Sequence, residues 1–318
     1  MEISTLDTLQ FKQYLESIDI APRTIKDYIT GVNYFLNFIQ TEDIQITKPD
    51  VLRFLEHLKG KGTQNITRQK YISTLTHYFN FLFEEEQVLT NPCWGLKIRG
   101  TNKKRLYKIY TPAELEELLN NFNHVFVRNF DYSHIPKNKQ KVTELCRERN
   151  LTMLNLFVNQ GILSHEINRI EVDDIDFKKA VINIRSGKVG RKRTIPLTKN
   201  QIPMLYYYIH EIYPQLLEYQ PNGSNRLFFN LPKISNTKSE NDNTKDMLYY
   251  LRKQIKSIDK KFSSFKQIRA SVITAWLKEH GLRRTQYLAG HKRITTTENY
   301  QCNNLDTLSK TINNLHPF

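Results

Sequence analysis

LAGHKRITTTENY, residues 288–300, combines a Gly-His pair, two cations, three threonines and a terminal tyrosine. Threonine and asparagine are poor residues for a helix interior, so this stretch is unlike an ordinary packed helix. A phenol can attack phosphorus and hold it covalently. The polar setting of His291 and Tyr300 therefore makes both of them candidate reactive residues.

Two earlier stretches add cations. SFKQIRASVITAWL, residues 264–277, carries Lys266 and Arg269 at the start of an apolar helix. AVINIRSGKVGRKRTIPL, residues 180–197, predicts a β-hairpin, because apolar residues alternate on both sides of a glycine turn that has Lys188 at its tip. Taken singly, a hairpin lysine is usually solvated and a Lys-x-x-Arg pair usually marks an exposed helical face.

Together these residues have one chemical logic. A phosphodiester in transfer gathers negative charge on its non-bridging oxygens, and cations stabilise that charge. The leaving 5′ hydroxyl needs a proton donor. Cations can do this work without a metal, so we expect neither a metal nor any other cofactor.

The overall charge favours a polyanionic partner. The chain has 318 residues, enough for two domains, and its 47 Lys and Arg against 32 Asp and Glu give a net charge of +15. Nucleic acid is the first candidate and an anionic membrane the second. A basic soluble protein without such a partner is the alternative.

Cysteine usage and hydropathy point to the cytoplasm. The cysteines Cys93, Cys146 and Cys302 are odd in number and far apart, so neither a disulfide framework nor a zinc site is indicated. No apolar run is long enough to cross a membrane. The polar N-terminal stretch is unlike a signal peptide. We therefore expect a cytoplasmic protein with no membrane partner.

The first hundred residues predict a compact all-helical domain. Apolar residues recur at helical spacing in four segments separated by short polar links. The segments are 5–18, 21–40, 47–62 and 65–86. Their aromatic stripe indicates a core rather than a surface on which bases stack.

Two of these helices begin with cations and hydroxyls, a pattern that suits phosphate contacts. The residues are Arg23, Thr24, Lys26, Thr67, Arg68 and Lys70. A merely solvated face is the alternative reading of both groups.

A change of character follows this helical region. Residues 99–110 are basic and lack apolar periodicity, which predicts a linker that can lie along DNA. A helix restarts at Thr111, with Pro112 at its first position and Glu114 placed for a capping box. We therefore expect a helical DNA-binding domain over residues 1–98 and a second domain over 111–318.

The chain resembles the tyrosine recombinase family of phage integrases, Xer-type resolvases and transposon integrases. GKVGRKRTIPL is similar to the family's β-hairpin, FKQIRASVITAWL to its His-or-Lys-x-x-Arg motif, and YLAGHKRITTTENY to its C-terminal box. The resemblance implies a mainly α fold with a small antiparallel sheet. It implies an all-helical, SAM-like core-binding domain followed by an α+β catalytic domain.

The resemblance also implies roles for the residues. Tyr300 would form a 3′-phosphotyrosyl bond, Lys188 would protonate the 5′ leaving oxygen, and Arg269 and Lys266 would hold the phosphate. His291 would hydrogen-bond the phosphate or help to activate the phenol. Four protomers would exchange strands between two double-stranded DNA sites through a Holliday junction, without a nucleotide cofactor.

One position departs from the family pattern. The arginine that usually grips the phosphate after the long apolar helix is Leu163 here. Losing such a clamp costs on the order of 3–4 kcal/mol at the transition state. Arg185 is the candidate substitute and His165 a weaker one. Otherwise the enzyme works more slowly with Arg269 alone, or the protein only binds DNA.

Two other functions therefore compete with site-specific recombination. A type IB topoisomerase shares the chemistry but relaxes supercoils as a monomer. A DNA-binding accessory protein would have an inactive site.

The tail, residues 304–318, places its apolar residues on one face of a short helix. The resemblance implies that this tail docks on a neighbouring protomer. A helix packed on its own domain is the alternative.

Overall fold

The computed structural model describes residues 5–39, 46–101, 107–185, 190–220, 223–231 and 245–301. The chain divides into two units, residues 1–104 and residues 105–318. Each unit has its own hydrophobic core. Within the described residues, no helix has the length and apolar character needed to cross a membrane.

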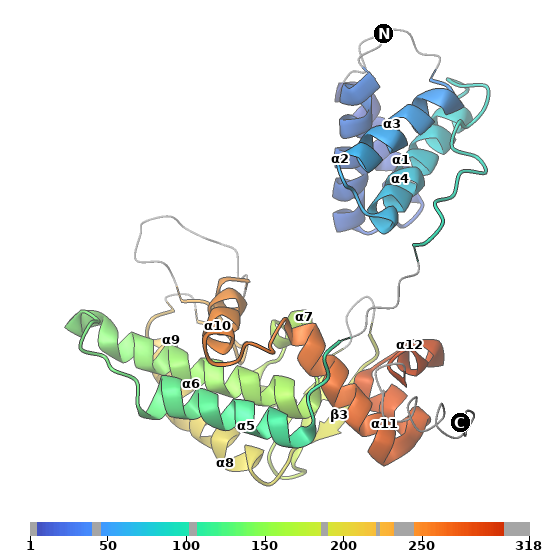
Figure 1. The fold of residues 1–318 in the computed structure, drawn as a ribbon. Helices are drawn as coiled ribbons and strands as arrows, with labels where there is room; N and C mark the ends of the chain where they lie inside the picture. Colours follow the sequence, from blue (N-terminus) through green and yellow to red (C-terminus); the bar gives the residue numbers. More distant parts are fainter. Residues whose placement is uncertain are drawn as a thin grey trace, which may run out of the picture. The chain divides into compact units, whose positions relative to one another are not determined.

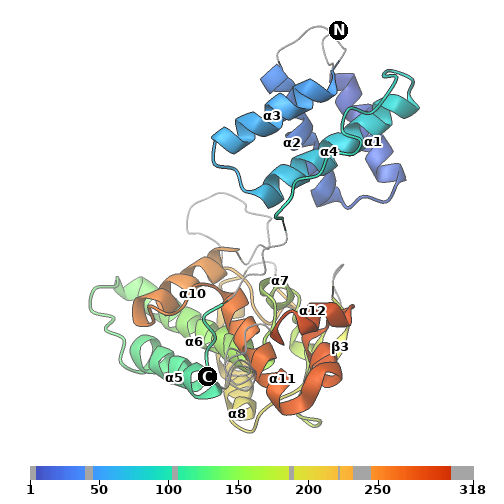
Figure 2. The same ribbon diagram turned by 45° about the vertical axis from the view of Figure 1, so that its right-hand side comes forward.

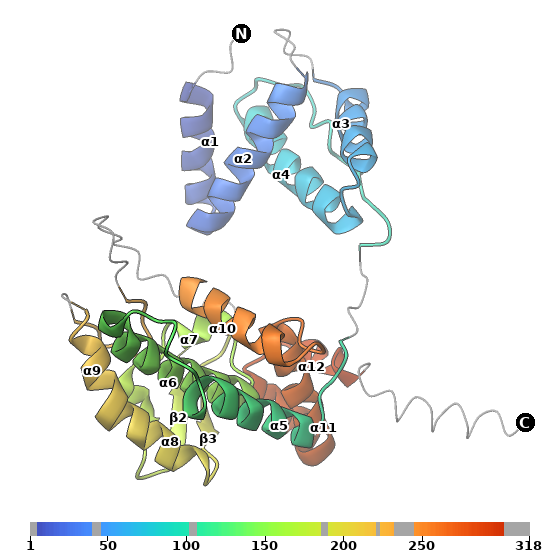
Figure 3. The same ribbon diagram turned by 60° about the vertical axis from the view of Figure 1, so that its left-hand side comes forward.

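The N-terminal unit consists of helices, as the sequence predicts. They are α1 (Thr5–Ser17), α2 (Pro22–Ile39), α3 (Lys48–Gly60) and α4 (Asn65–Glu84). Figure 3 shows α2 lying between α1 and α4, and it packs on both. The aromatic stripe forms the core: Phe11, Phe35, Phe54 and Phe79 are almost completely buried.

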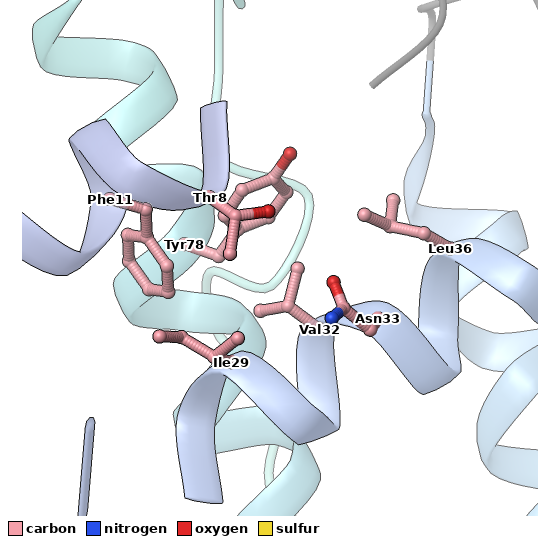
Figure 4. Close-up of a pocket in the computed structure, with 7 residues that line it drawn as sticks. All are labelled: Thr8, Phe11, Ile29, Val32, Asn33, Leu36 and Tyr78. Carbon is pink, nitrogen blue, oxygen red and sulfur yellow. The ribbon is translucent and has the colours of Figure 1, made fainter. Parts of the chain in front are cut away.

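A small hollow lies between α1, α2 and α4 (Figure 4). The side chains of Phe11, Ile29, Val32 and Tyr78 are among those that line it, and its volume is about 10 Å³. That is room for about one water molecule. The hollow is a packing gap in an apolar core and not a ligand site.

The C-terminal unit combines helices with one small sheet. Its elements are α5 (Pro112–Asn123), η1 (His124–Arg128), α6 (Lys137–Gln160), α7 (Ser164–Ile167), η2 (Val172–Asp174), β1 (Ile175–Asp176), β2 (Val181–Ile184), β3 (Arg193–Pro196), α8 (Gln201–Tyr207), η3 (Tyr208–Ile212), α9 (Tyr213–Leu217), α10 (Lys245–Ile258), α11 (Phe265–Ala289) and α12 (Ile294–Glu298). Helices α5 and α6 lie side by side (Figure 1).

The predicted capping box begins this unit. The hydroxyl of Thr111 accepts a hydrogen bond from the backbone N–H of Glu114 at 3.2 Å, and the Glu114 carboxylate accepts one from the backbone N–H of Thr111 at 2.7 Å. Pro112 occupies the first helical position, where its missing N–H costs nothing. The local sequence therefore marks the start of α5, and a salt bridge from Lys261 to Glu114 at 2.7 Å adds a tertiary contact there.

The sheet is antiparallel with the order β1-β2-β3, and β2 pairs with β3 as the predicted hairpin. Ile182 lies opposite Ile195, and both are buried. Strand alternation turns Arg193 to the same buried side as Ile195. The tip of the hairpin, which includes Lys188, lies outside the described residues.

Helix α11 carries the site. It packs on α6, β3 and α12, and Figure 2 shows α12 and β3 beside it. The helix is kinked at Gly281, whose φ of +73° is a conformation that side chains with a Cβ rarely adopt. The first part of α11 is buried against α6, whereas the second part ends at Ala289, next to His291.

Candidate active site

Arg269 lies on the buried side of α11, and only 4% of the residue is exposed. Its Nη1 donates to the carbonyl of Gly161 at 2.5 Å, and its Nη2 donates to the carbonyl of Ala289 at 2.6 Å. Burial lowers the pKa of Arg269, but a guanidinium keeps its proton in proteins. The end of α6 and the end of α11 therefore hold a fixed positive charge between them.

His291 contacts this guanidinium. Its Nε2 lies 3.3 Å from Nη2 of Arg269, and its Nδ1 lies 2.9 Å from the hydroxyl of Thr297. A guanidinium can only donate, so Nε2 accepts and the proton of a neutral imidazole is on Nδ1. Burial, followed by the charges of Arg269 and Arg193, lowers the pKa of His291 to about 4. The imidazole is therefore neutral at pH 7, with the lone pair of Nε2 directed at Arg269.

Tyr300 completes the cluster from the end of α12. Its ring stacks against the imidazole of His291, with 5.7 Å between the ring centroids and 13° between the planes. It is also close enough to Arg269 to offset part of the burial effect on the pKa of that arginine. Three of the predicted site residues, Arg269, His291 and Tyr300, are thus brought together.

The three threonines do form a short helix, α12, although their propensity disfavours one. Tertiary contacts explain why this helix forms. Thr297 is completely buried, and its hydroxyl bonds to the His291 imidazole. Contacts of this kind override helix propensity, which is only a weak preference. One turn of helix places this hydroxyl against the imidazole.

A buried ion pair, which the sequence analysis did not single out, supports the cluster. Both terminal nitrogens of Arg193 donate to the Glu166 carboxylate, at 2.7 and 2.9 Å, and the Arg193 side chain is 0% exposed. Glu166 also accepts from the backbone N–H of Leu163 at 2.8 Å. Burial alone would raise the pKa of Glu166, but its bonds and attraction to Arg193 lower it overall.

Arg193 also reaches the loop that carries His291. A Cβ added at Gly290 would lie 2.7 Å from Nη1 of Arg193, which is closer than real Cβ atoms come. The guanidinium therefore fills the space directly beside this loop. Strand alternation through Arg193, Ile195 and Leu197 is the sequence signal that could have identified it as an inward-facing residue.

Leu163, where the resemblance predicts that the family pattern has an arginine, is half-buried just before α7. Arg185 makes a different set of contacts. Its guanidinium pairs with Glu171 at 2.6 Å and with Asp174 at 3.0 Å. It would have to leave both carboxylates to bind a phosphate. His165 is exposed on α7.

Lys266 is exposed in the first turn of α11, one turn before Arg269 on the same helix. It therefore lies at the edge of the cluster, whereas Arg269 lies inside it. Lys188 and the tail, residues 304–318, fall outside the described residues. Among the residues that the structure describes, no group of three or more His, Cys, Asp or Glu is placed to hold a metal ion.

The predicted DNA-contacting side chains of the N-terminal unit differ in exposure. Arg23 and Lys26 near the start of α2 are exposed, as is Lys70 near the start of α4. Arg68 is half-buried, and its Nη2 donates to the Asn65 side chain at 2.9 Å. Thr67 is exposed and Thr24 is half-buried. The exposed members are free to meet a phosphate, but their role stays a prediction.

Comparison with known proteins identifies the family. The phage integrase family matches residues 126–306, and the N-terminal SAM-like domain of phage integrases matches residues 9–86. The chain belongs to the phage integrase family. This confirms the resemblance and the fold class inferred from the sequence, a SAM-like helical domain followed by a mainly helical integrase domain with a small sheet.

The curated relatives are tyrosine recombinases. XerD of Staphylococcus saprophyticus is 29% identical over 172 residues, which cover 53% of this chain and 55% of the relative. XerC of Chlamydia caviae is 28% identical over 183 residues, which cover 53% of this chain and 52% of the relative. The chain thus spans about half the length of the curated relatives that it matches.

Solved structures share the fold. XerH site-specific recombinase bound to its difH substrate has a TM-score of 0.66 at 18% identity, covering 95% of this chain and 83% of that chain. A lambda integrase (75–356) dimer bound to a COC′ core site has a TM-score of 0.64 at 16% identity, covering 95% and 96%. The likeness therefore extends over nearly the whole chain.

Proposed function

We propose that the protein is a site-specific DNA recombinase that cleaves and rejoins duplex DNA through a covalent 3′-phosphotyrosyl intermediate. The observation that carries the proposal is the meeting of Arg269, His291 and Tyr300 in one cluster. A nucleophile, a proton acceptor and a fixed cation are the groups that phosphoryl transfer to a phenol requires. Membership of the phage integrase family supports it.

In the proposed reaction, the Tyr300 oxygen attacks the scissile phosphorus and the bond to the 5′ oxygen breaks. The phenolic proton leaves as the new bond forms, and the neutral imidazole of His291 can accept it once Nη2 of Arg269 has turned from Nε2 to the phosphate. Lys188 would give a proton to the departing 5′ oxygen. Joining is the reverse step, in which a 5′ hydroxyl attacks the phosphotyrosine, so the energy of the broken bond is retained.

Arg269 is suited to hold the non-bridging oxygens. Of the five N–H donors of a guanidinium, two bond to the carbonyls of Gly161 and Ala289 and one faces His291. Donors remain for a phosphate, and charge-assisted hydrogen bonds of this kind are strong. Lys266, one turn away, would add a second charge at the edge.

We propose that residues 1–98 and residues 111–318 each contact duplex DNA, with the basic residues 99–110 as the linker. The exposed cations of α2 and α4 would contact phosphates in the N-terminal domain. Lambda integrase, whose fold this chain shares with a TM-score of 0.60, has been seen as a tetramer bound to a Holliday junction. A four-protomer complex on two DNA sites, in the cytoplasm, is therefore the proposed working state.

Covalent trapping on a nicked suicide substrate tests the proposal. The wild-type protein should form a protease-sensitive DNA adduct, and Tyr300→Phe should abolish the adduct while DNA binding is retained. Tyr219→Phe is the matched control, because Tyr219 is an exposed tyrosine at the end of α9. An adduct that survives in Tyr300→Phe would show that another residue is the nucleophile.

The same assay separates the competing functions. An accessory protein would bind the site but form no adduct in the wild type. A type IB topoisomerase would form the adduct and relax supercoiled DNA as a monomer. Strand exchange between two sites, with assembly of four protomers on native gels, is expected only of a recombinase.

A further inference from the structure

A hollow of about 330 Å³ opens beside the candidate active site. The second part of α11 forms one wall through Arg283, Gln286 and Tyr287. Arg191 and Lys192, which precede β3, line it as well. We call this hollow the cationic pocket. Gly290 and His291 also line it, so it shares the imidazole with the active site.

Three cations line this pocket, and no carboxylate does. Arg191, Lys192 and Arg283 are all exposed at its rim. Within the part of the chain that the structure describes, none of the three forms an ion pair with an Asp or Glu. An anion with several oxygens can therefore accept charge-assisted hydrogen bonds from more than one of them.

The walls of the pocket are fixed by hydrogen bonds. The backbone N–H of Arg191 donates to the carbonyl of Gly290 at 3.1 Å. The side-chain amide of Gln286 donates to the carbonyl of His291 at 3.2 Å, and the Tyr287 hydroxyl accepts from the backbone N–H of Thr194 at 3.2 Å. These bonds tie the hairpin, the loop and α11 together, so the cations surround a built hollow.

We propose that the cationic pocket binds a phosphate of the cleaved DNA strand next to the scissile one, and so sets which phosphate faces Tyr300. The inference rests on the proposed function, because DNA supplies the ligand. Phosphates follow one another along a strand at the spacing of the nucleotides. A strand whose scissile phosphate lies against one side of His291 places a neighbouring phosphate within reach of the other side.

The cationic pocket would affect the position of the DNA strand in the active site more than the overall affinity for DNA. An arginine that grips the scissile phosphate directly is absent at Leu163, so the strand has one contact fewer to fix its register. A second phosphate held by Arg283 and Arg191 would restore that constraint from outside the reacting centre. Correct placement of the reacting atoms is itself a large part of catalysis.

The test combines protein variants with neutralised phosphates. Suicide substrates carry a single uncharged methylphosphonate at each linkage flanking the cleavage point in turn. Arg283→Ala is expected to lower the cleavage rate about tenfold, as for the loss of a charge-assisted bond. One flanking methylphosphonate should lower the rate similarly in the wild type. On the substrate with the methylphosphonate at that linkage, and on no other substrate, Arg283→Ala should cleave as fast as the wild type.

Arg284→Ala is the matched control. Arg284 is an exposed neighbour on the same helix and does not line the pocket. It should change cleavage by less than about twofold, as expected of a surface charge. If Arg283→Ala and Arg284→Ala lower the cleavage rate equally, the proposal is overturned. The same holds if the effect of Arg283→Ala adds to that of the methylphosphonate at every linkage. Either result would mean that the positive charge acts on the DNA generally and not at one phosphate.

The binding affinity of the Tyr300→Phe variant for the same substrates separates this inference from the proposed function. If the wild-type protein never forms an adduct, the proposed recombinase activity fails. The pocket is still tested, because Arg283→Ala in the Tyr300→Phe background should lose binding non-additively with the same single methylphosphonate. Affinities that depend on no particular linkage would exclude the pocket as a phosphate site.

Discussion

The imidazole of His291 lies flat against the ring of Tyr300, with 13° between their planes, while its Nδ1 bonds to Thr297 on the short helix that joins them. One turn of helix therefore determines both the place of the nucleophile and the orientation of its neighbour. The arrangement makes Thr297 a positioning residue, since its hydroxyl selects the tautomer that leaves Nε2 open toward Arg269.

Thr297→Val removes the hydroxyl and keeps the shape of the side chain. One lost hydrogen bond of about 1 kcal/mol predicts a cleavage rate about fivefold lower, with DNA affinity unchanged. Single-turnover cleavage on the suicide substrate measures the effect. Thr296→Val, at the exposed neighbouring position, is the control and should cleave like the wild type. Equal rates for both variants would remove Thr297 from the site.

The low pKa of His291 predicts a specific dependence on pH. Between its ordinary pKa of about 6.5 and the folded value of about 4, the unfolded chain binds a proton at this residue and the folded chain does not. The free energy of unfolding should therefore fall as the pH falls through this window, and His291→Gln should flatten the decline. Part of the slope should remain, because burial also lowers the pKa of His77.

Nuclear magnetic resonance provides the direct measurement. The imidazole C2 proton of His291, assigned by its absence in His291→Gln, should titrate near pH 4 in the free protein. A bound phosphate should raise that pKa, because a negative charge stabilises the imidazolium. A midpoint near 6.5 in the free protein would contradict the buried, neutral imidazole described above.

Breaking the buried pair between Glu166 and Arg193 should strongly destabilise the C-terminal unit, because it leaves a buried group without its partner. Removing one partner of a buried ion pair typically costs about 3–5 kcal/mol, so Glu166→Gln should lower the free energy of unfolding by an amount in this range. Glu171→Gln, at the partly exposed pair with Arg185, should cost no more than about 1 kcal/mol. Urea denaturation measures both, and equal losses would show that the buried pair is not special.

Leu163→Arg restores the guanidinium that the family pattern places there. A transition-state contact of this kind is worth about 10²-fold in rate, so cleavage should rise by at least about tenfold. Leu163→Met is the control, because it adds length without charge. If the two variants cleave alike, or if both cleave more slowly than the wild type, the clamp is already supplied by another group.

Arg185→Ala tests whether Arg185 is the group that replaces the missing arginine. Its salt bridges to Glu171 and Asp174 predict that the substitution leaves the cleavage rate nearly unchanged and costs about 1 kcal/mol of stability or less. Rates and affinities measured on one substrate decide the matter. A large loss of cleavage with intact binding would identify Arg185 as the substitute cation.

Local sequence was enough to predict the elements whose formation depends on local interactions. The capping box at Thr111, the helical stripes of the N-terminal unit and the alternation of β2 and β3 all agree with the structure. Arg269, His291 and Tyr300 could be predicted together because each belongs to a recognisable motif with its own local spacing.

Contacts between residues far apart in the sequence could not be predicted from local patterns. The position of Arg185 on the hairpin, three residues before Lys188, made it the candidate substitute for the missing arginine. In the structure its guanidinium bonds to the carboxylates of Asp174 and Glu171. Arg193 appears among several surface-like cations, yet its partner Glu166 lies on another element. Arg193 and Glu166 come together only when the chain folds. The number of cations in a stretch of sequence does not show which of them is buried.

Gly290 limits how this loop can be altered in the laboratory or by mutation. Its φ of +68° admits glycine or asparagine most readily, and the adjacent guanidinium of Arg193 leaves no room even for a methyl group. A saturation library at position 290 alone should therefore return only glycine among functional clones. A shorter residue at position 193 would make room for a side chain at 290, but it would leave the buried Glu166 carboxylate without its partner. The ion pair and the glycine therefore constrain each other.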